Sequence, residues 1–471
     1  MDSNLKYDAV VVGSGPNGLS AAITLARKGV SVLVLEARNT IGGGARSEAL
    51  TLPGFIHDVC SAVHPMGLAS PFFKELPLED HGLSFVHPDI PLAHPLSGGR
   101  AAILERSFQQ TAQSFAKDRD AYLRIFSPFL PRVDDLFEDL IGPFRFPRYP
   151  FLALNFARFA LQSAQGLAGR SFQTEEAKAL WAGLAAHSIL PLRTVSTSAI
   201  ALVLGLVGHA YGWPFAKGGS QSIPDALASY LRSLGGEIRT GVTVSSMKDI
   251  PECRWVFLDM TPNKIVNIEG LELSGCVRKQ LQNFRYGPGV FKIDFALKEA
   301  IPWTNKNCAR AGTVHVGGTL SEITASEEAA YKGHLSDEPF VLVAQPSLFD
   351  STRAPAGKHV AWAYCHVPNA SEVDRSEVIE KQIEKYAPGF RDCILARHTK
   401  NAREMERYNA NYFGGDITGG VTDLRQLFTR PLLRLNPYQL NKNVFICSAS
   451  SPPGAGVHGL CGYYSASNVL K

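Results

Sequence analysis

The segment 7–18 reads YDAVVVGSGPNG and defines the architecture of the N-terminal part of the chain. It begins with a mainly apolar run that ends in three successive valines, which is typical of a central parallel strand. A glycine turn spaced GxGxxG follows at once. Helical spacing of apolar residues then covers 19–26, and a second strand, VSVLVL at 30–35, ends at Glu36. This order of elements is typical of a βαβ unit that binds a dinucleotide.

Each residue of this unit has a physical reason to be there. Gly13 permits the tight turn, Gly15 lets the backbone approach a pyrophosphate, and Gly18 lets the helix pack closely on the strand. The helix N-terminus offers N–H groups and partial positive charge to the phosphates. The carboxylate of Glu36 can accept both ribose hydroxyls and repels a 2′-phosphate. We therefore assign six residues to cofactor binding: Gly13, Gly15, Pro16, Asn17, Gly18 and Glu36.

The composition excludes several classes of protein. Among 471 residues, 47 Lys and Arg stand against 43 Asp and Glu, which gives a formal charge of +4. This weak balance argues against a nucleic-acid partner. With 45% hydrophobic and 19% charged residues, the chain is globular, not disordered, collagen-like or coiled-coil. The length predicts two or three structural units.

Cysteine usage and the absence of apolar targeting segments predict a cytoplasmic protein. The eight cysteines are scattered without a CxxC pair, which favours reduced thiols and excludes a disulfide-reductase site. The N-terminus has no apolar signal region. The longest apolar run, 199–208, is about half as long as a membrane-spanning helix. We expect at most peripheral contact with a membrane.

A second glycine-rich segment, ARNTIGGGARS at 37–47, follows the acid immediately. It resembles the second glycine motif of the flavin amine oxidase and phytoene desaturase superfamily. The resemblance implies FAD as the cofactor instead of NAD, with a glycine pair and an arginine beside the FAD pyrophosphate. A surface glycine loop is the alternative. The residues that the resemblance assigns to the cofactor are Ala37, Arg38, Gly43, Gly44, Ala45 and Arg46.

Two later segments carry the same resemblance. After a strand pattern at 443–447, the run SASSPPGAGVHGLCG at 448–462 resembles the C-terminal FAD motif of the superfamily. It implies a helix N-terminus near Val457 and His458 that faces the flavin, with Ser448 and Gly456 also at the cofactor. Segment 217–239, with glycine pairs on both sides of a predicted helix, resembles the element that precedes the adenine-contacting strand. This assigns the backbone of Val244, in a strand with Val242, to adenine. Whether FAD is covalently attached stays open.

The resemblance implies an α/β fold in which the head and tail of the chain share one cofactor. A discontinuous, Rossmann-like FAD-binding domain is expected from 1–95, 215–270 and 425–471. An inserted α+β substrate domain is expected from 100–210 and 275–420. Apolar periodicity predicts helices and strands in these inserted segments, so we expect a mixed sheet with capping helices.

Lys292 is the first candidate catalytic residue, in GVFKIDF at 289–295. Flavin amine oxidases have a similar stretch, whose lysine holds a water against flavin N5 and assists the reaction of reduced flavin with oxygen. Strand alternation places Lys292 and Asp294 on one face, so a simple ion pair is the alternative.

Residues 54–65 provide three further candidates, His57, Asp58 and His64. The resemblance places a strand here along the flavin face, with an acid at the position of Asp58. Histidines with pKa values near neutrality could transfer protons, or they could simply line the cavity. One strand cannot surround an ion, so no metal is predicted.

The stretch 143–159 interleaves aromatic residues with arginines. This pattern suits a membrane interface or the mouth of a tunnel for a lipid-like substrate. A proline-rich connector followed by a core helix is the alternative.

Taken together, the chain resembles the phytoene desaturase-like family, including its pyridine nucleotide-disulphide oxidoreductase domain protein 2 branch. The resemblance implies an FAD-dependent oxidoreductase that moves hydride from an apolar, lipid- or polyene-like substrate to flavin N5, a desaturation. Amine oxidation with O2 as acceptor, a redox-neutral isomerase and a flavin-bearing interaction protein remain open. The oligomeric state is not predicted.

Overall fold

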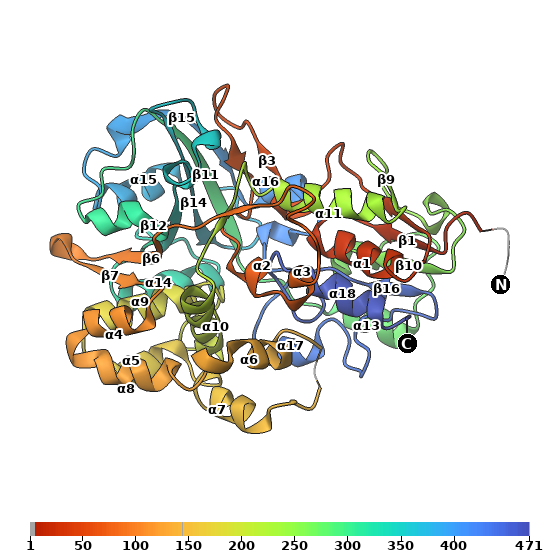
Figure 1. Ribbon diagram of the computed structural model, residues 1–471, viewed down its shortest axis with the longest axis horizontal. Helices are drawn as coiled ribbons and strands as arrows, with labels where there is room; N and C mark the ends of the chain where they lie inside the picture. Colours follow the sequence, from red (N-terminus) through yellow and green to blue (C-terminus); the bar gives the residue numbers. More distant parts are fainter. Residues whose placement is uncertain (1–4, 144, 471) are drawn as a thin grey trace.

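The computed structural model describes residues 5–143 and 145–470, arranged around two large sheets (Figure 1). The first sheet has five parallel strands in the order β16-β10-β1-β2-β9. Its strands come from three distant parts of the chain: Ala9–Val12 (β1), Val32–Leu35 (β2), Glu237–Arg239 (β9), Trp255–Leu258 (β10) and Val444–Ile446 (β16). The predicted discontinuous α/β fold is thereby confirmed.

Helices cover both faces of this sheet because its strands are apolar on both sides. Helices α1 (Pro16–Ala26), α11 (Ser222–Ser233) and α18 (Leu460–Ser467) lie together on one face (Figure 1). Helices α12 (Pro262–Ile265) and α13 (Gly275–Gln282) contribute to the apolar core on the other. The C-terminal helix α18 packs against the N-terminal helix α1 on the first of these two faces. A Cβ on Gly462 of α18 would lie 1.8 Å from the Asn17 carbonyl oxygen of α1, so the two helices are in backbone contact.

The second sheet has seven strands in the order β15-β11-β14-β13-β12-β6-β7. It is mixed, since β12 and β6 are parallel and the other neighbours are antiparallel. Its strands are Ile90–Pro95 (β6), Ala101–Leu104 (β7), Gly289–Leu297 (β11), Ala311–Val316 (β12), Val341–Ala344 (β13), His359–Val367 (β14) and Ile394–Lys400 (β15). The first segment expected in the FAD-binding domain ends at residue 95. Its last six residues form β6, which is a strand of this second sheet.

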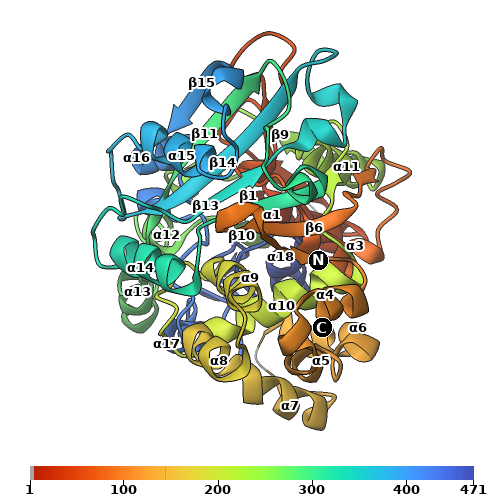
Figure 2. The same cartoon turned by 90° about the vertical axis from the view of Figure 1, so that its left-hand side faces the viewer.

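Helices gather beneath the second sheet as Figure 1 is oriented, and on its sides (Figure 2). The lower group comprises α4 (Phe108–Ser114), α5 (Arg119–Phe126), α6 (Val133–Leu140), α7 (Pro150–Ala160), α8 (Ala164–Ser171), α9 (Glu175–Ala186) and α10 (Thr197–Ala210). Helices α14 (Leu320–Tyr331), α15 (Ser376–Glu384) and α16 (Ala402–Tyr408) contact strands of this sheet, and three more helices are α2 (Pro65–Ala69), α3 (Pro71–Lys74) and α17 (Leu424–Thr429). Two small antiparallel pairs complete the fold: β3 (Ser47–Glu48) with β4 (His57–Asp58), and β5 (Phe85–Val86) with β8 (Phe215–Ala216).

The longest apolar run forms α10, which has 14 residues. Within residues 5–143 and 145–470, no helix combines the length and the apolar character that crossing a membrane requires.

One predicted strand is wrong. The strand expected to contain Val242 and Val244 stops at Arg239, the last residue of β9. Gly241 has φ +72 and turns the chain, so its N–H donates to the Arg38 carbonyl at 2.9 Å instead of continuing the ladder. The backbone still follows the end of β2, because the N–H of Val242 donates to the Glu36 carbonyl at 2.9 Å. Val244 is buried in the core beyond this turn.

Candidate functional site

The glycine turn between β1 and α1 leaves no space for side chains. Gly13 has φ +104, a conformation that is strained for other residues. A Cβ on Gly18 would lie 2.1 Å from the Gly13 carbonyl oxygen, so only glycine lets the helix approach the strand this closely. Helix α1 then begins with Pro16, and Asn17 is buried beside it. The turn is therefore a backbone-lined cradle at a helix N-terminus, as a pyrophosphate requires.

Glu36 is fixed at the end of β2, next to the glycine turn. Its Oε2 accepts hydrogen bonds from the backbone N–H and the hydroxyl of Ser14, at 3.0 and 2.6 Å. Its Oε1 accepts from the Arg38 N–H at 2.9 Å and from the Arg46 guanidinium at 3.1 Å. With only 7% of the residue exposed, these bonds hold the carboxylate in one orientation, beside the cradle.

The second glycine segment contacts the first. A Cβ on Gly43 would lie 3.0 Å from the Gly15 Cα, and one on Gly44 would lie 1.9 Å from the Tyr412 hydroxyl. Ala45, which follows, is fully buried. The predicted neighbourhood of the two glycine segments is therefore present in the fold.

The arginines of this segment have partners within the protein. The Arg46 guanidinium donates to the Thr40 and Gly43 carbonyls as well as to Glu36, and lies over the Tyr408 ring. Arg38 is exposed and donates to the carbonyls of residues 407 and 408 at the end of α16. Ala37 is exposed as well. The cofactor contacts predicted for these residues stay predictions.

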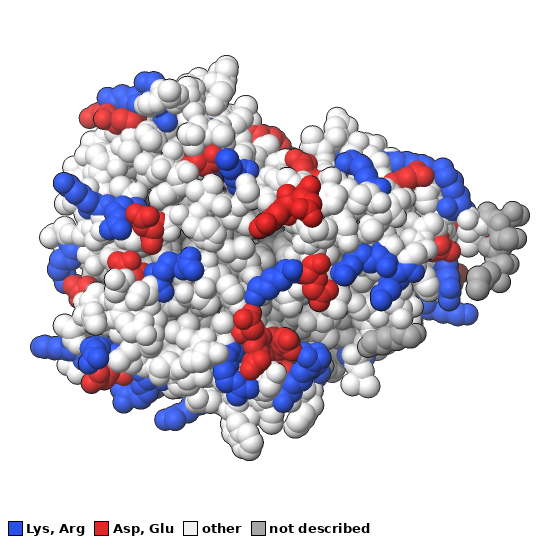
Figure 3. All heavy atoms as spheres, viewed as in Figure 1, with Lys and Arg blue, Asp and Glu red and all other residues white. Residues whose placement is uncertain are grey.

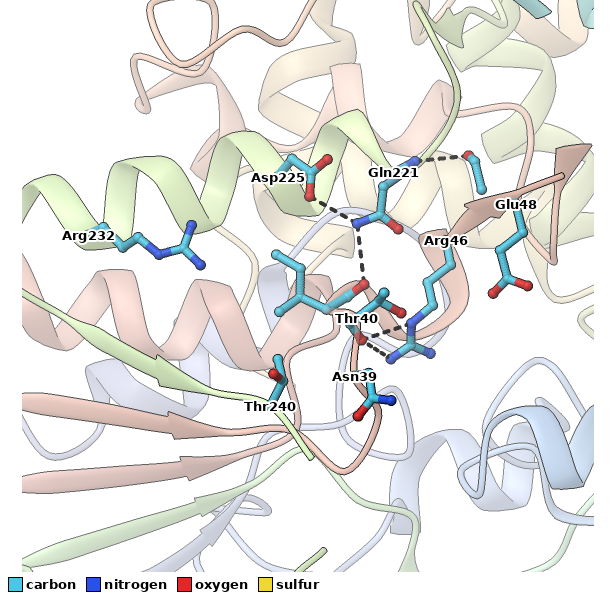
Figure 4. A pocket seen from close by; sticks show the side chains of 10 residues that line it. Asn39, Thr40, Arg46, Glu48, Gln221, Asp225, Arg232 and Thr240 are labelled. Carbon is cyan, nitrogen blue, oxygen red and sulfur yellow. Dashed lines mark hydrogen bonds between the residues drawn. The ribbon is translucent and has the colours of Figure 1, made fainter. Parts of the chain in front are cut away.

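A pocket of about 500 Å³ adjoins Arg46, between the 39–48 loop and the start of α11 (Figure 4). The Gln221 amide crosses it, donating to the Ile41 carbonyl at 3.3 Å and to Asp225 at 3.0 Å. Acidic and basic groups are mixed, so the lining is polar without a dominant charge. The lining residues are Asn39, Thr40, Ile41, Arg46, Ser47, Glu48, Gln221, Asp225, Arg232 and Thr240.

The C-terminal motif is anchored against the same cradle. The Ser448 hydroxyl donates to the Met260 carbonyl at 2.8 Å, just beyond β10. Gly456 has φ +140, and the half-buried Val457 follows. His458 Nδ1 accepts the N–H of Leu460, the first residue of α18, at 3.1 Å. Burial lowers the pKa of His458 to about 4, which keeps the ring neutral and able to accept.

Asp58 joins three separate segments. Its Oδ1 accepts from the Ser47 hydroxyl and the Ser220 N–H, both at 2.7 Å, and its Oδ2 from the Arg353 guanidinium at 2.8 Å. Burial alone raises the pKa of this carboxyl, but Arg353 and the hydrogen bonds outweigh it and lower the pKa. Asp58 is therefore an ionised anchor, and this geometry favours a positioning role over proton transfer.

The two predicted histidines are neutral in this environment. His57 Nε2 hydrogen-bonds the Thr51 hydroxyl at 2.7 Å, and burial with the charges of Lys292 and Arg353 lowers its pKa to about 3. His64 Nε2 hydrogen-bonds the Ser220 hydroxyl at 2.7 Å, and burial lowers its pKa to about 4. Neither histidine carries a proton to donate near neutral pH, and the Nε2 atom of each is already hydrogen-bonded within the protein, which favours the cavity-lining alternative over proton donation.

Lys292 and Asp294 form the ion pair that strand alternation predicted. Both side chains are 2% exposed, and Nζ contacts Oδ2. Burial raises the pKa of Asp294 to about 6 despite the opposing charge of Lys292. Lys292 also lies 5.9 Å from the centroid of the Trp362 ring, whose Nε1 donates to the Cys60 carbonyl at 2.9 Å.

The strand registers place Lys292 in one row that crosses the second sheet. The row runs through Lys400 of β15, Lys292 of β11, Tyr364 of β14, Leu342 of β13 and His315 of β12. Since side chains alternate along a strand, these five project from the same face of the sheet. This face, hereafter the inner face, packs into the large core shared with α1 and α9, whereas the opposite face has its own core.

The inner face ends in a buried histidine cluster. His187, which follows α9, and His315 lie 2.9 Å apart through their Nε2 atoms, and His94 packs beside His315 with ring centroids 6.4 Å apart. Burial lowers the pKa of His187 to about 3 and that of His94 to about 4. Nearby, His366 Nδ1 pairs with the Glu327 carboxylate at 2.8 Å. Despite this density, no group of three or more His, Cys, Asp or Glu in the described part of the chain is arranged to hold a metal ion.

The comparisons with known proteins identify the family. The model of the flavin containing amine oxidoreductase family matches residues 17–262, just over half of the chain. The chain belongs to this family and is an FAD-dependent oxidoreductase.

Several relatives match nearly the full length. The chain is 27% identical to pyridine nucleotide-disulfide oxidoreductase domain-containing protein 2 of Mus musculus, over 99% of this chain and 94% of that protein. It is 22% identical to a phytoene desaturase (lycopene-forming) of a Paracoccus species, over 96% and 95%. Among solved structures, an oxidoreductase from Methanosarcina mazei has a TM-score of 0.66 at 16% identity, covering 98% of this chain and 99% of that one. Putrescine oxidase bound to putrescine has 0.63 at 17%, covering 98% and 99%. These structures show the shared fold.

FAD fits the residues present. The glycine cradle, the carboxylate of Glu36 and the N-terminal turn of α18 supply groups of the kind that a pyrophosphate, a ribose and a flavin ring need, although the Leu460 N–H of α18 is already bonded to His458. The cradle also contains the carboxyl of Asp259, which as a carboxylate would repel the anionic pyrophosphate.

Sequence reasoning missed several residues of this site, among them Asp259, Arg353, Trp362, Tyr408 and Tyr412. Only Asp259 had a local signal. It follows a predicted strand directly, and the carboxyl ends of parallel strands meet at one edge of a sheet. The other four residues reach the site because segments far apart in the sequence pack together, and no sequence motif indicates this packing.

Proposed function

We propose that this oxidoreductase dehydrogenates an apolar, lipid- or polyene-like substrate, forming a carbon–carbon double bond. FAD, when bound, supplies the acceptor of the hydride. The proposal is supported by the inner face of the second sheet, which is aromatic and aliphatic between Lys292 and the histidine cluster. An apolar lining of this kind would favour an extended apolar chain beside it over a charged substrate. The phytoene desaturase relative acts, by its name, on a polyene.

The residues of this face provide position and a dry environment. Trp362 and Tyr364 lie edge to face at 5.0 Å, and each is less than 10% exposed. The Trp362 indole is fixed by its bond to the Cys60 carbonyl, so this aromatic wall is rigid. The histidines beyond Tyr364 are neutral at physiological pH and add no net charge. Forming the double bond removes a hydride, which FAD would accept when bound, and a proton from the adjacent carbon, which would be released to solvent. The hydride transfer depends on orientation of the substrate and on desolvation, and this face provides both.

Amine oxidation with O2 as acceptor is the second candidate, and one observation favours it. Lys292 is buried on the inner face beside Trp362, where the superfamily resemblance expects the lysine that assists the oxygen reaction. The cation is paired with Asp294, which weakens its field. We therefore rank this candidate below dehydrogenation.

The deciding experiment follows bleaching of the flavin band of the FAD-loaded protein under strictly anaerobic conditions. We expect bleaching by a long-chain polyene and recovery of a product lacking two hydrogens. Trp362→Ala should slow bleaching at least tenfold while FAD retention is unchanged, and Leu395→Ala, which alters an exposed leucine, should have no effect. Bleaching by long-chain amines alone would replace the proposal with amine oxidation. A product with an unchanged hydrogen count, formed without bleaching, would replace it with isomerisation.

A further inference from the structure

A carboxyl group lies inside the glycine cradle. Asp259 follows β10 directly, and its Oδ2 accepts the backbone N–H of Gly18 at 3.1 Å. A Cβ on Gly15 would lie 2.8 Å from the same oxygen, and one on Gly13 would lie 2.9 Å from the Asp259 Cβ. The side chain therefore touches all three glycines of the turn and covers the N-terminal end of α1 from the strand side.

The position of Asp259 is fixed by its backbone. Its N–H donates to the Val12 carbonyl at 2.8 Å, and its own carbonyl accepts from the Asn411 amide at 2.8 Å. Both bonds tie the backbone of Asp259 to neighbouring segments, and the bond from the Gly18 N–H holds the carboxyl itself in the cradle. With 8% of the residue exposed, little water reaches it.

The charged and titratable groups around Asp259 do not neutralise it. Glu36, at the end of β2, adds a second negative charge. The Arg46 guanidinium is occupied by Glu36 and by two carbonyls. Cys447 follows β16 and Cys461 lies in α18; burial raises the pKa of both thiols, so both are neutral at pH 7. Burial raises the pKa of Asp259 to about 7, Glu36 reinforces this, and the Gly18 N–H opposes it.

We infer that Asp259 sets the affinity of the protein for FAD, by binding the cofactor only as the neutral acid. The FAD pyrophosphate is an anion that requires the same helix N-terminus and the same glycine backbone. An ionised Asp259 places a like charge in that cradle and competes for the Gly18 N–H. Protonation removes the charge and leaves an O–H that can donate to a phosphate oxygen. Binding of FAD above neutral pH therefore takes up one proton from solvent at Asp259.

The test measures FAD binding to the apoprotein, with no substrate and no turnover. FAD fluorescence is titrated with wild type, Asp259→Asn and Asp120→Asn between pH 5.5 and 8.5. Asp120 is an exposed acid of α5 and serves as the matched control for the loss of one charge. For wild type and the control we expect the dissociation constant to rise about tenfold per pH unit above pH 7, as one coupled proton requires. For Asp259→Asn we expect a flat profile and at least tenfold tighter binding at pH 8.5.

Calorimetry of the wild type gives an independent readout. Titration at pH 8 in two buffers of different ionisation enthalpy should show uptake of about one proton per FAD. This measurement decides the proposal even if Asp259→Asn does not fold. A dissociation constant of the wild type that does not change with pH, an unaltered slope in Asp259→Asn, or no proton uptake would each overturn it.

Discussion

The Lys292 ammonium contacts the carboxylate of Asp294, two residues further along β11, and both side chains are 2% exposed. The two groups therefore pair side by side on one strand face in an apolar core. His57 and His398 also face Asp294, at 3.7 and 4.0 Å, but both have lowered pKa values and are neutral at physiological pH. The pair, together with Lys400 in the same row, therefore supplies the charge at this end of the inner face.

Replacing Lys292 with Met should destabilise the protein by about 3–5 kcal/mol, because it leaves the Asp294 carboxylate buried without its cation. The double variant Lys292→Met with Asp294→Asn should recover most of this loss. Guanidinium unfolding at pH 7 measures both. If amine oxidation is the activity, oxygen consumption by the reduced enzyme should be slow in both variants. An unaltered rate in the double variant removes the support that Lys292 gives to the oxidase candidate.

Replacing Glu36 with Gln should weaken FAD binding about 10–100-fold, since two charge-assisted hydrogen bonds to a ribose are worth roughly 1.5–3 kcal/mol together. Glu36→Arg should abolish retention, because a guanidinium would face that of Arg46. The measurement is the ratio of flavin to protein absorbance after desalting. Glu48→Gln, an exposed acid of the neighbouring pocket in Figure 4, is the control. Equal retention by all three variants would mean that the adenosine end lies elsewhere.

Acidification should destabilise the folded chain steeply below pH 6.5, and His64 should carry part of the effect. Its folded pKa is about 4, whereas an unfolded histidine titrates near 6.5. Between these values the unfolded chain binds a proton that the folded chain does not. The free energy of unfolding therefore falls by about 1.4 kcal/mol per pH unit for this group as pH drops. The free energy of unfolding, plotted against pH for wild type and His64→Gln, should differ in slope by about this amount between pH 4.5 and 6 and run parallel above pH 7. Identical slopes below pH 6 would contradict the assignment.

The parts of the site that could be predicted are those whose residues lie close together in the sequence. The glycine turn and Glu36 belong to one continuous βαβ unit, so spacing alone identified them. The Lys292–Asp294 pair followed from alternation along a single strand. In contrast, the partner of Asp58 is Arg353, 295 residues away, and Asp259 reaches Gly18 across 241 residues. Such contacts depend on how sheets and loops pack, which no local pattern specifies. The strand expected at Val244 failed because the turn at Gly241 ends β9 early.

The membrane contact predicted for residues 143–159 stays a prediction, and the structure shows which apolar side chains of this stretch are exposed; residue 144 lies outside the described part of the chain. Phe151 and Leu154 of α7 are 87% and 70% exposed, and Phe146 before the helix is 85% exposed. Helix α7 lies at the lower edge of the molecule in both ribbon views (Figures 1 and 2). The nearby arginines are largely compensated, since Arg148 pairs with Glu138 at 2.7 Å. Basic and acidic side chains accordingly lie side by side over the α6–α7 region of the face in Figure 3.

We therefore predict that attachment to lipid vesicles is driven by apolar insertion of α7 and is similar for neutral and anionic lipids. The double variant Phe151→Ser with Leu154→Ser should lower cosedimentation with phosphatidylcholine vesicles at least tenfold. Half-burying two such side chains is worth roughly 1.5–3 kcal/mol. Leu435→Ser, which changes a fully exposed leucine outside α7, should leave attachment and FAD content unchanged. Binding that requires anionic lipid would assign attachment to charge instead of α7. Absence of wild-type cosedimentation with either lipid would leave the connector and core-helix interpretation as the correct one.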